Sequence, residues 1–301
     1  MNREKCNEPE VSMITVVNSD SSFDAIFKLL HSFFPQEGGI DYEFIVVDEE
    51  NKQKAKIYSE RFPWVNLIQT KEMTRGSHLR NVALQIARGN IIVFLEDHIT
   101  VQKNYLKNLK SCFSNNFDAV GGPVINGNTD RLSSWIQYFC DYHKYTVNIQ
   151  EGEIDNLPGC NFAYRSDSLK ELGFFKEGNF KLEYLFNEKA KQKGKKFYFS
   201  HSLKIKHFED KNIFDIWAYR FHYGRVFASK RGFPRWKRIS YTVLSPFVAM
   251  VEYIRIFKNI RGDQTYLRKF VECSPLLLLT LFIWMFGECL GYIFGNNTSK
   301  N

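Results

Sequence analysis

Apolar and polar positions along the chain predict strands that alternate with helices. Short apolar runs of the kind that form buried strands occur at 11–17, 43–48, 65–69, 90–95, 118–124, 196–200 and 203–207. Helices are expected between them at 23–33, 52–62, 74–87, 103–114, 180–193 and 213–230, and a helix or long loop at 135–145. Strands that alternate with helices build right-handed βαβ units, so the pattern predicts an α/β fold with parallel strands.

The run at 90–95 ends abruptly in three polar residues, Glu96, Asp97 and His98. Such side chains add little to the stability of a buried strand. Open α/β sheets, however, bind ligands just beyond the carboxyl ends of their strands. Carboxylates and imidazoles are also common metal ligands. The sequence therefore predicts a ligand site at this edge, with the alternative that the three residues cap the following turn.

The composition of the chain changes after Gly232, which predicts a boundary between an α/β domain, 1–232, and a membrane-association region, 233–301. Between 225 and 269 the acids are only Glu252 and Asp263, whereas the basic residues are Arg225, Lys230, Arg231, Arg235, Lys237, Arg238, Arg255, Lys258, Arg261, Arg268 and Lys269. Apolar residues lie at helical spacing within this zone: Phe247, Met250, Val251, Ile254 and Phe257. A basic amphipathic helix of this type lies in a membrane interface.

The segment 274–295, from Ser274 to Gly295, is about as long as the roughly 20 residues that a bilayer span needs. Glu288 is its one charged residue. If the segment spans a membrane, the basic residues before it hold the α/β domain at the cytoplasmic face. A re-entrant or monotopic arrangement, or a buried hydrophobic hairpin, would have the same composition.

A formal net charge of +8 and a pI of about 9.0 indicate an anionic partner, such as a phosphorylated substrate or an anionic lipid. Nucleic-acid binding is not expected, because the basic residues cluster around the amphipathic region and no recognition motif is present.

The six cysteines form no CxxC pair. Neither a zinc site nor a disulfide framework is therefore expected, and the thiols are taken to be reduced.

Five short motifs follow one another along the chain: Val46-Val47-Asp48, Arg80-Asn81, Phe94-Leu95-Glu96-Asp97-His98, Pro158-Gly159-Cys160-Asn161 and Leu172-Gly173-Phe174-Phe175. Together they resemble the family 2 glycosyltransferases with the GT-A fold, over roughly residues 10–230. The resemblance implies a GT-A-like Rossmann-type mixed sheet with flanking helices, to which C-terminal membrane-associated helices are added. It also implies an inverting transfer of a sugar from a nucleotide diphosphate-sugar, with UDP-sugar as the expected donor, to an acceptor hydroxyl.

The resemblance assigns the donor site to residues near the ends of the predicted strands. Asp48 is expected to pair with the nucleobase, with the alternative that it starts a helix. Arg80 would approach the diphosphate or position Asp48, with a surface charge as the alternative. Glu96 and Asp97, together with Asn18 in the loop after the first strand, complete the expected contacts with the nucleotide-sugar.

The same resemblance implies a divalent cofactor, Mn²⁺ or Mg²⁺, that bridges the two phosphates and stabilises the leaving group. Glu96 and His98 lie where related enzymes place the outer acids of an Asp-x-Asp motif. His98 is expected to be a direct ligand, and an imidazole suits Mn²⁺ better than Mg²⁺. His207 closes a strand near the place where similar enzymes offer a histidine to the metal, although a lone histidine is more often structural.

An inverting transfer needs a carboxylate that takes the proton of the acceptor hydroxyl. Related enzymes place it about three helical turns before a helix-ending glycine. Counting back from Gly194 gives Glu183, with Glu188 and Asp141 as further candidates. A solvated helix charge is the other explanation for Glu183.

Acceptor contacts are expected from Asp141, Tyr142, Asn161 and Arg225, since aromatic rings stack on sugars and arginine binds phosphate. The acceptor would be lipid-linked or a glycan, as in the synthesis of a cell-surface polysaccharide at a membrane.

Two rival functions stay open. A sugar nucleotidyltransferase would want a glycine-rich phosphate loop, but 18–22 contains no glycine. A catalytically impaired relative, serving as a membrane-bound binding or scaffold subunit, would explain the altered residues at 96–98 and 182–183.

Overall fold

The computed structural model describes residues 8–17, 23–71, 76–173, 175 and 182–295. The chain divides into two compact units, each assembled from two stretches of sequence. The sheet unit comprises Met1–Ile125 and Gln150–His207, and the helical unit comprises Asn126–Ile149 and Phe208–Asn301. The domain boundary at residue 232, which composition predicts, stays a prediction.

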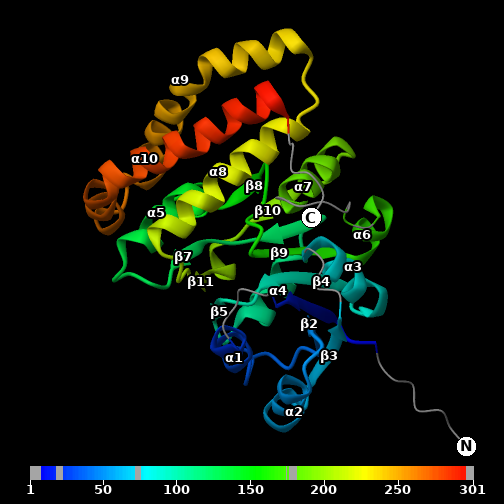
Figure 1. The fold of residues 1–301 in the computed structure, drawn as a ribbon. Coiled ribbons are helices and arrows are strands. Elements are labelled where there is room, and N and C mark those ends of the chain that lie inside the picture. The colour runs from blue at the N-terminus through cyan, green and yellow to red at the C-terminus, as the bar shows by residue number, and fades with distance from the viewer. Residues whose placement is uncertain (1–7, 18–22, 72–75, 174, 176–181, 296–301) are drawn as a thin grey trace, which may run out of the picture. The chain divides into compact units, whose positions relative to one another are not determined.

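A mixed eight-stranded sheet forms the centre of the sheet unit (Figure 1). Its strand order is β3 (Val65–Thr70), β2 (Tyr42–Glu49), β1 (Val11–Val16), β4 (Ile91–Glu96), β9 (Asn161–Arg165), β6 (Ala119–Gly121), β10 (Phe197–Phe199) and β8 (Gly152–Ile154). The first four strands are parallel, and β9 runs antiparallel to both of its neighbours. The predicted α/β class with a mixed sheet is confirmed.

The central strands form where the sequence has continuous apolar runs. Every residue of β1 is buried, and β4 is buried up to its last residue, Glu96. The register pairs Val16 of β1 with both Val47 of β2 and Glu96 of β4, so the carboxyl ends of the three strands lie level with one another. This alignment brings residues that are far apart in sequence to one edge of the sheet.

Helices α1 (Phe23–Ser32), α2 (Lys52–Arg61), α3 (Gly76–Ile86), α4 (Tyr105–Cys112), α6 (Ser166–Leu172) and α7 (Leu182–Gln192) connect and flank these strands. Phe94 of β4 stacks on Phe162 of β9, with ring centroids 4.9 Å apart, and meets Phe175 edge-on at 5.2 Å. The Asn81 side chain exchanges two 2.9 Å hydrogen bonds with the backbone of Phe175. These contacts bring together the motifs at 80–81, 94–98 and 172–175, which are far apart in the sequence.

A second, three-stranded sheet has the order β5 (Ile99–Val101), β11 (Ile205–His207) and β7 (Val124–Asn126). β11 pairs antiparallel with β5, which places His207 opposite Ile99. Because Ile99 directly follows His98, this register brings the two histidines together across more than a hundred residues of sequence.

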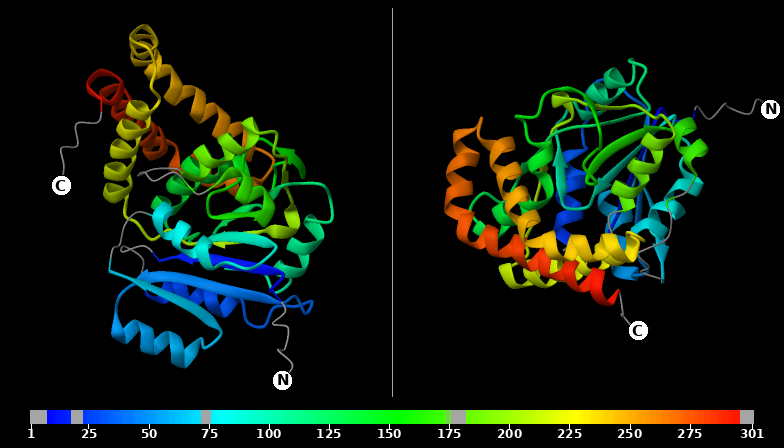
Figure 2. Two further views of the ribbon diagram at one scale, coloured as in Figure 1. Left: turned by 90° about the vertical axis from the view of Figure 1, so that its right-hand side faces the viewer. Right: turned by 90° about the horizontal axis from the view of Figure 1, so that it is seen from above.

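The helical unit contains α5 (Leu132–Tyr142), the short 3-10 helix η1 (His143–Tyr145), α8 (Ile213–Lys230), α9 (Arg235–Ile260) and α10 (Gln264–Phe294). α10 runs parallel to α8 and antiparallel to α9 (Figure 2). It contacts α8 between Thr280 and Gly291, and α9 between Ser274 and Tyr292. A short 3-10 helix of the sheet unit, η2 (His201–Leu203), precedes β11.

Within the described residues, α10 is the one helix that is by itself long and apolar enough to cross a membrane. α9 bends by 63° between Arg235–Ser245 and Phe247–Ile260, and it meets the same test only if the two segments are taken as one span. Proline within a helix is a common cause of such a bend, and Pro246 lies between the two segments. The C-terminal helix is long and apolar enough to span, as the sequence predicts, but it begins at Gln264, ten residues before the predicted segment 274–295.

Candidate functional site

Three side chains with metal-binding atoms converge beside the carboxyl end of β4. Glu96 is the last residue of β4, His98 lies in the turn to β5, and His207 ends β11. One ligand atom from each of the three lies within 4.8 Å of the others. The Nε2 atom of His207 lies 3.0 Å from Oε2 of Glu96, and Nε2 of His98 lies 3.5 Å from the same oxygen. We call Glu96, His98 and His207 the ligand cluster.

The neighbouring charges keep the Glu96 carboxylate ionised. Burial acts to raise the pKa of Glu96, but the hydrogen bond from His207 and the charge of His98 act against it. With a further contribution from Arg80, these interactions lower the pKa of Glu96 to about 2. The cluster therefore presents a carboxylate anion beside two imidazoles at neutral pH.

Asp97 holds His98 in place rather than adding a fourth ligand. Its carboxylate is fully buried, and Oδ1 accepts a 2.7 Å hydrogen bond from Nδ1 of His98. Because a carboxylate only accepts, the Nδ1 atom carries the proton and Nε2 of a neutral ring is left with its lone pair. A carboxylate that orients a ligating histidine in this way is a common feature of metal sites. Sequence reasoning placed Asp97 at the site, but only the geometry gives it this positioning contact.

Arg80 lies inside the sheet unit next to this cluster. It projects from α3, is 8% exposed, and its guanidinium carbon lies 5.9 Å from the ring centroids of both Phe94 and Phe162. Burial lowers the pKa of Arg80, and the charge of Glu96 partly offsets this effect. The alternative that Arg80 is a surface charge on its helix is therefore wrong.

Asp48 ends up fully buried near the end of β2, one residue beyond the position level with Glu96. Its Oδ1 atom accepts a 3.2 Å hydrogen bond from Nζ of Lys54, and its Oδ2 atom accepts a 3.1 Å bond from the hydroxyl of Tyr58. Burial, followed by the charge of Asp48, raises the pKa of Tyr58. Sequence reasoning missed Lys54 and Tyr58, whose signal is their spacing on one face of the polar helix α2.

Asn161 has a framework position. It is fully buried in β9, where its Oδ1 atom accepts a 2.7 Å hydrogen bond from the Tyr105 hydroxyl. Its Nδ2 atom donates a 2.7 Å bond to the carbonyl of Leu203. These bonds tie β9 to α4 and to the segment before β11. The structure thus gives no support to the predicted acceptor contact of Asn161.

Two predicted site residues fall where the structure gives no side-chain description. Asn18 lies outside the described residues. Glu183 lies in the first turn of α7, but its side chain is also outside the described part of the chain. Glu188, the further candidate on the same helix, is half-buried.

Three predicted acceptor residues, Asp141, Tyr142 and Arg225, belong to the helical unit. Asp141 is engaged there: its Oδ2 atom accepts 2.7 Å hydrogen bonds from Nη2 of Arg220 and from Nε2 of Gln137. Arg220 is 3% exposed, and the charge of Asp141 helps to raise its pKa despite the opposing effect of burial. The Oδ2 atom of Asp141 is thus already engaged within the helical unit, which makes this carboxylate a poor substitute for Glu183.

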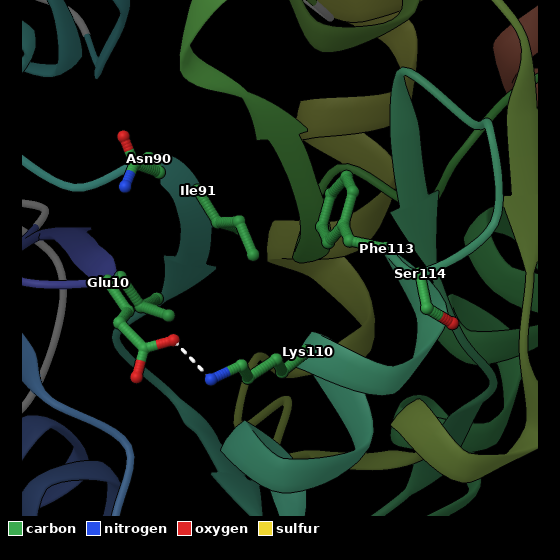
Figure 3. A pocket seen from close by; sticks show the side chains of 7 residues that line it. Glu10, Asn90, Ile91, Lys110, Phe113 and Ser114 are labelled. Carbon is green, nitrogen blue, oxygen red and sulfur yellow. Dashed lines mark ion pairs between the residues drawn. The ribbon is translucent and has the colours of Figure 1, made fainter.

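A separate cavity of about 320 Å³ opens at the other end of the strands (Figure 3). It lies against Glu10 and Val11 at the start of β1 and Asn90 and Ile91 at the start of β4. An ion pair between Glu10 and Lys110 crosses its margin. Since ligands of open α/β sheets bind at the carboxyl ends of strands, this cavity is distinct from the candidate site.

The family model for glycosyl transferase family 2 matches residues 13–173, which is more than half of the chain. The chain belongs to glycosyl transferase family 2. The matched range of this family 2 chain includes Asp48, Arg80 and the segment 96–98, whereas Glu183 and His207 lie beyond it. The resemblance carried by the five sequence motifs is therefore confirmed.

Among solved structures, the family 2 chain is similar to a crystal structure of GalNAc-T7 with UDP, GalNAc and Mn²⁺. The two are 13% identical with a TM-score of 0.53, and the match covers 68% of this chain and 44% of that chain. This likeness confirms the GT-A fold. A search of curated proteins finds no match for the chain.

Proposed function

We propose that this family 2 chain is an inverting glycosyltransferase that moves a sugar from a UDP-sugar to a hydroxyl of a membrane-borne or polysaccharide acceptor. The observation that carries the proposal is the ligand cluster at the carboxyl ends of the parallel strands. Family membership supports glycosyl transfer, and the UDP and Mn²⁺ bound by GalNAc-T7 support a nucleotide-sugar donor and a metal.

The cluster fits a divalent transition metal. One carboxylate and two imidazoles favour Mn²⁺ over Mg²⁺, which prefers oxygen ligands. Glu96, His98 and His207 would hold the ion, and Asp97 would keep the His98 ring in its ligating orientation. When bound, the metal supplies positive charge that stabilises a diphosphate leaving group.

The remaining donor contacts come from residues at the same edge of the sheet. The buried guanidinium of Arg80 would balance phosphate charge beside Glu96. Asp48 would hold the nucleobase, with its carboxylate fixed by Lys54 and Tyr58. Asn18, which follows β1 in the sequence, is the remaining proposed contact with the nucleotide-sugar.

Glu183 is proposed as the general base, because the transfer needs a carboxylate near the acceptor hydroxyl. Asp141, Tyr142, Asn161 and Arg225 are the proposed acceptor contacts, of which Asn161 has the least support. Residues 233–301 would hold the enzyme at the cytoplasmic face of a membrane, where a lipid-linked acceptor is within reach.

Thermal unfolding of the full chain with UDP-sugars, with and without Mn²⁺, tests the donor site. Ligand at about 100 times its dissociation constant adds about 2.7 kcal/mol to the free energy of unfolding, so the Tm should rise when donor and Mn²⁺ are present together. His98→Ala should abolish the Mn²⁺-dependent part of this rise. His201→Ala is the matched control, because His201 is an exposed histidine outside the cluster.

Turnover tests the chemistry. Slow hydrolysis of the donor, or transfer with inverted anomeric configuration seen by NMR, is the expected result, and Glu183→Gln should lower kcat while UDP still raises the Tm. A wild type that neither binds nor turns over any UDP-sugar with Mn²⁺ would contradict the proposal and favour a scaffold subunit. A retained anomeric configuration would contradict the inverting assignment alone.

A further inference from the structure

Exposed apolar side chains occur on both segments of α9, before and after its 63° bend. They recur every three or four positions and comprise Trp236, Ile239, Val243, Phe247, Val251, Ile254 and Phe257. Their exposed fractions range from 41% for Phe257 to 69% for Trp236. We call this set the α9 face. A set of exposed apolar residues this large marks a site of interaction.

Basic residues border the α9 face at both ends. Arg235 precedes Trp236, and Arg255, Lys258 and Arg261 accompany the last two turns, all of them exposed. Glu252 is the one acid of α9, and its carboxylate is engaged by Nε2 of His143 at 2.9 Å and by Nη1 of Arg255 at 3.2 Å. The border of the face is therefore positive, which complements anionic headgroups.

α10 is fixed against α8 too closely to act as an independent span. A Cβ at Gly287 would clash with the backbone oxygen of Phe221, and one at Gly291 with that of Arg225. From the other side, a Cβ at Gly224 of α8 would clash with the backbone oxygen of Trp284. The two helices thus touch backbone to backbone over at least two turns.

The companion helix α8 is unsuited to hydrocarbon. Beside the same part of α10 it exposes Asp215, His222 and Lys230 to solvent. If α10 crossed a bilayer while it kept its contacts with α8, these charged and polar groups would enter the hydrocarbon. Charged side chains inside the hydrocarbon of a bilayer carry a large free-energy cost.

α9 is fixed to α10 as well. Nε of Arg238 donates a 2.6 Å hydrogen bond to the carbonyl of Tyr292 at the end of α10, and the hydroxyls of Tyr253 and Ser274 are 2.8 Å apart. The three helices therefore form one packed layer within the helical unit, with α10 as its middle member. Such a layer can rest on a bilayer but cannot release one helix to cross it.

We infer that α9 docks in the plane of an anionic bilayer, with its apolar face in the interface and its basic border on the headgroups, while α10 stays on the same side of that bilayer. This inference rests on the proposed membrane association but not on the proposed glycosyl transfer. It decides between the spanning and monotopic arrangements that composition left open.

A second copy of the chain is a poorer occupant of the α9 face. A symmetric dimer would bring the basic borders of two copies together and leave like charges opposed. Anionic lipid supplies both an apolar interior and negative charge in one partner. The charge of the border therefore selects lipid over self-association.

Flotation of the full chain with vesicles tests the docking surface. Vesicles of phosphatidylcholine mixed with phosphatidylglycerol should carry the protein upward, and phosphatidylcholine alone should do so weakly. Phe247→Glu with Ile254→Glu should abolish flotation. The matched control is Phe34→Glu with Ile86→Glu, since Phe34 and Ile86 are equally exposed apolar residues in the sheet unit and should leave flotation unchanged.

Removal of charge tests the basic border separately. Arg255→Gln and Lys258→Gln should each weaken binding to the anionic vesicles by roughly fivefold, the effect of about 1 kcal/mol per basic residue. Flotation of the Phe247→Glu/Ile254→Glu variant like wild type would overturn the inference. A wild-type protein that does not bind vesicles, but that forms a dimer or binds a protein partner through this face, would also overturn the inference.

Protease protection tests the position of α10. In sealed bacterial spheroplasts, a tag fused after Asn301 should be protected together with the sheet unit and cut only after lysis. A tag that is cut in intact spheroplasts while the sheet unit is protected would show that α10 crosses, and would overturn the inference. A rise in Tm with UDP and Mn²⁺ needs no membrane, so it reports on the proposed function independently.

Discussion

At the scale of single residues, His98 is held by a hydrogen bond at one of its two ring nitrogens. Nδ1 donates to the buried carboxylate of Asp97 at 2.7 Å, which leaves Nε2 directed toward Glu96. The His207 ring approaches from β11, with ring centroids 4.4 Å apart. His98 thus acquires a fixed tautomer and a fixed direction, which suits it to bind a metal.

Asp97→Asn tests this arrangement. The amide keeps the shape of the side chain but loses the charge that orients and polarises His98, so the affinity for Mn²⁺ should fall by about 10- to 100-fold. Titration calorimetry with Mn²⁺ measures the change directly. Asp155→Asn, at an exposed carboxylate elsewhere in the sheet unit, should leave the affinity unaltered. Equal affinity in the Asp97 variant would mean that His98 does not depend on Asp97.

At the scale of secondary-structure elements, two packing arrangements shape the molecule. The antiparallel pairing of β5 with β11 delivers His207 to the site, and the contact between α8 and α10 builds the helical unit. Both depend on close backbone approach. In α10 this approach is possible because Gly287 and Gly291 lack side chains at the contact.

Gly287→Ala should therefore destabilise the helical unit, because the added methyl group meets the backbone of Phe221 and the helices must separate. Overpacking of this kind costs about 1 to 3 kcal/mol, measured as a loss in the free energy of unfolding by urea. Gly262→Ala is the control, since nothing nearer than 3.7 Å would meet its Cβ. If the two variants were equally stable, the helices would not be in close contact at Gly287.

At the scale of the whole molecule, the ligand cluster links positions 111 residues apart through Glu96 and His207. Such a link contributes to global stability only while the carboxylate is charged. The pKa of Glu96 is about 2 in the folded chain, below the value of about 4.3 expected when unfolded. Its stabilising contribution is therefore complete above about pH 4.3 and is lost as the pH falls toward 2.

Glu96→Gln gives the corresponding prediction for metal-free protein. The variant cannot ionise, so its deficit in the free energy of unfolding relative to wild type should shrink between about pH 6 and about pH 3. Urea unfolding at a series of pH values measures this deficit. A deficit that is constant across the range would show that the charge of Glu96 adds nothing to stability.

The sequence by itself determined the order and kind of most elements, because buried strands and one-sided helices leave apolar periods that are readable locally. It also predicted that Glu96 and His98 end a central strand. Short elements were harder to predict, because they depend on their partners. The expected strand at 203–207 shortens to β11, since Leu203 ends the 3-10 helix η2, and the strands β5, β7 and β8 carry too few residues to show a period.

Only the tertiary structure decided which residues meet. The register of β11 on β5 brings His207 to His98, and the fold buries Arg80 and directs Asp97 to the His98 ring. It likewise packs α10 closely against α8, a contact that composition does not reveal. Hydrophobic periodicity is a local property of the chain, whereas these contacts depend on the alignment of distant segments, which no local pattern encodes.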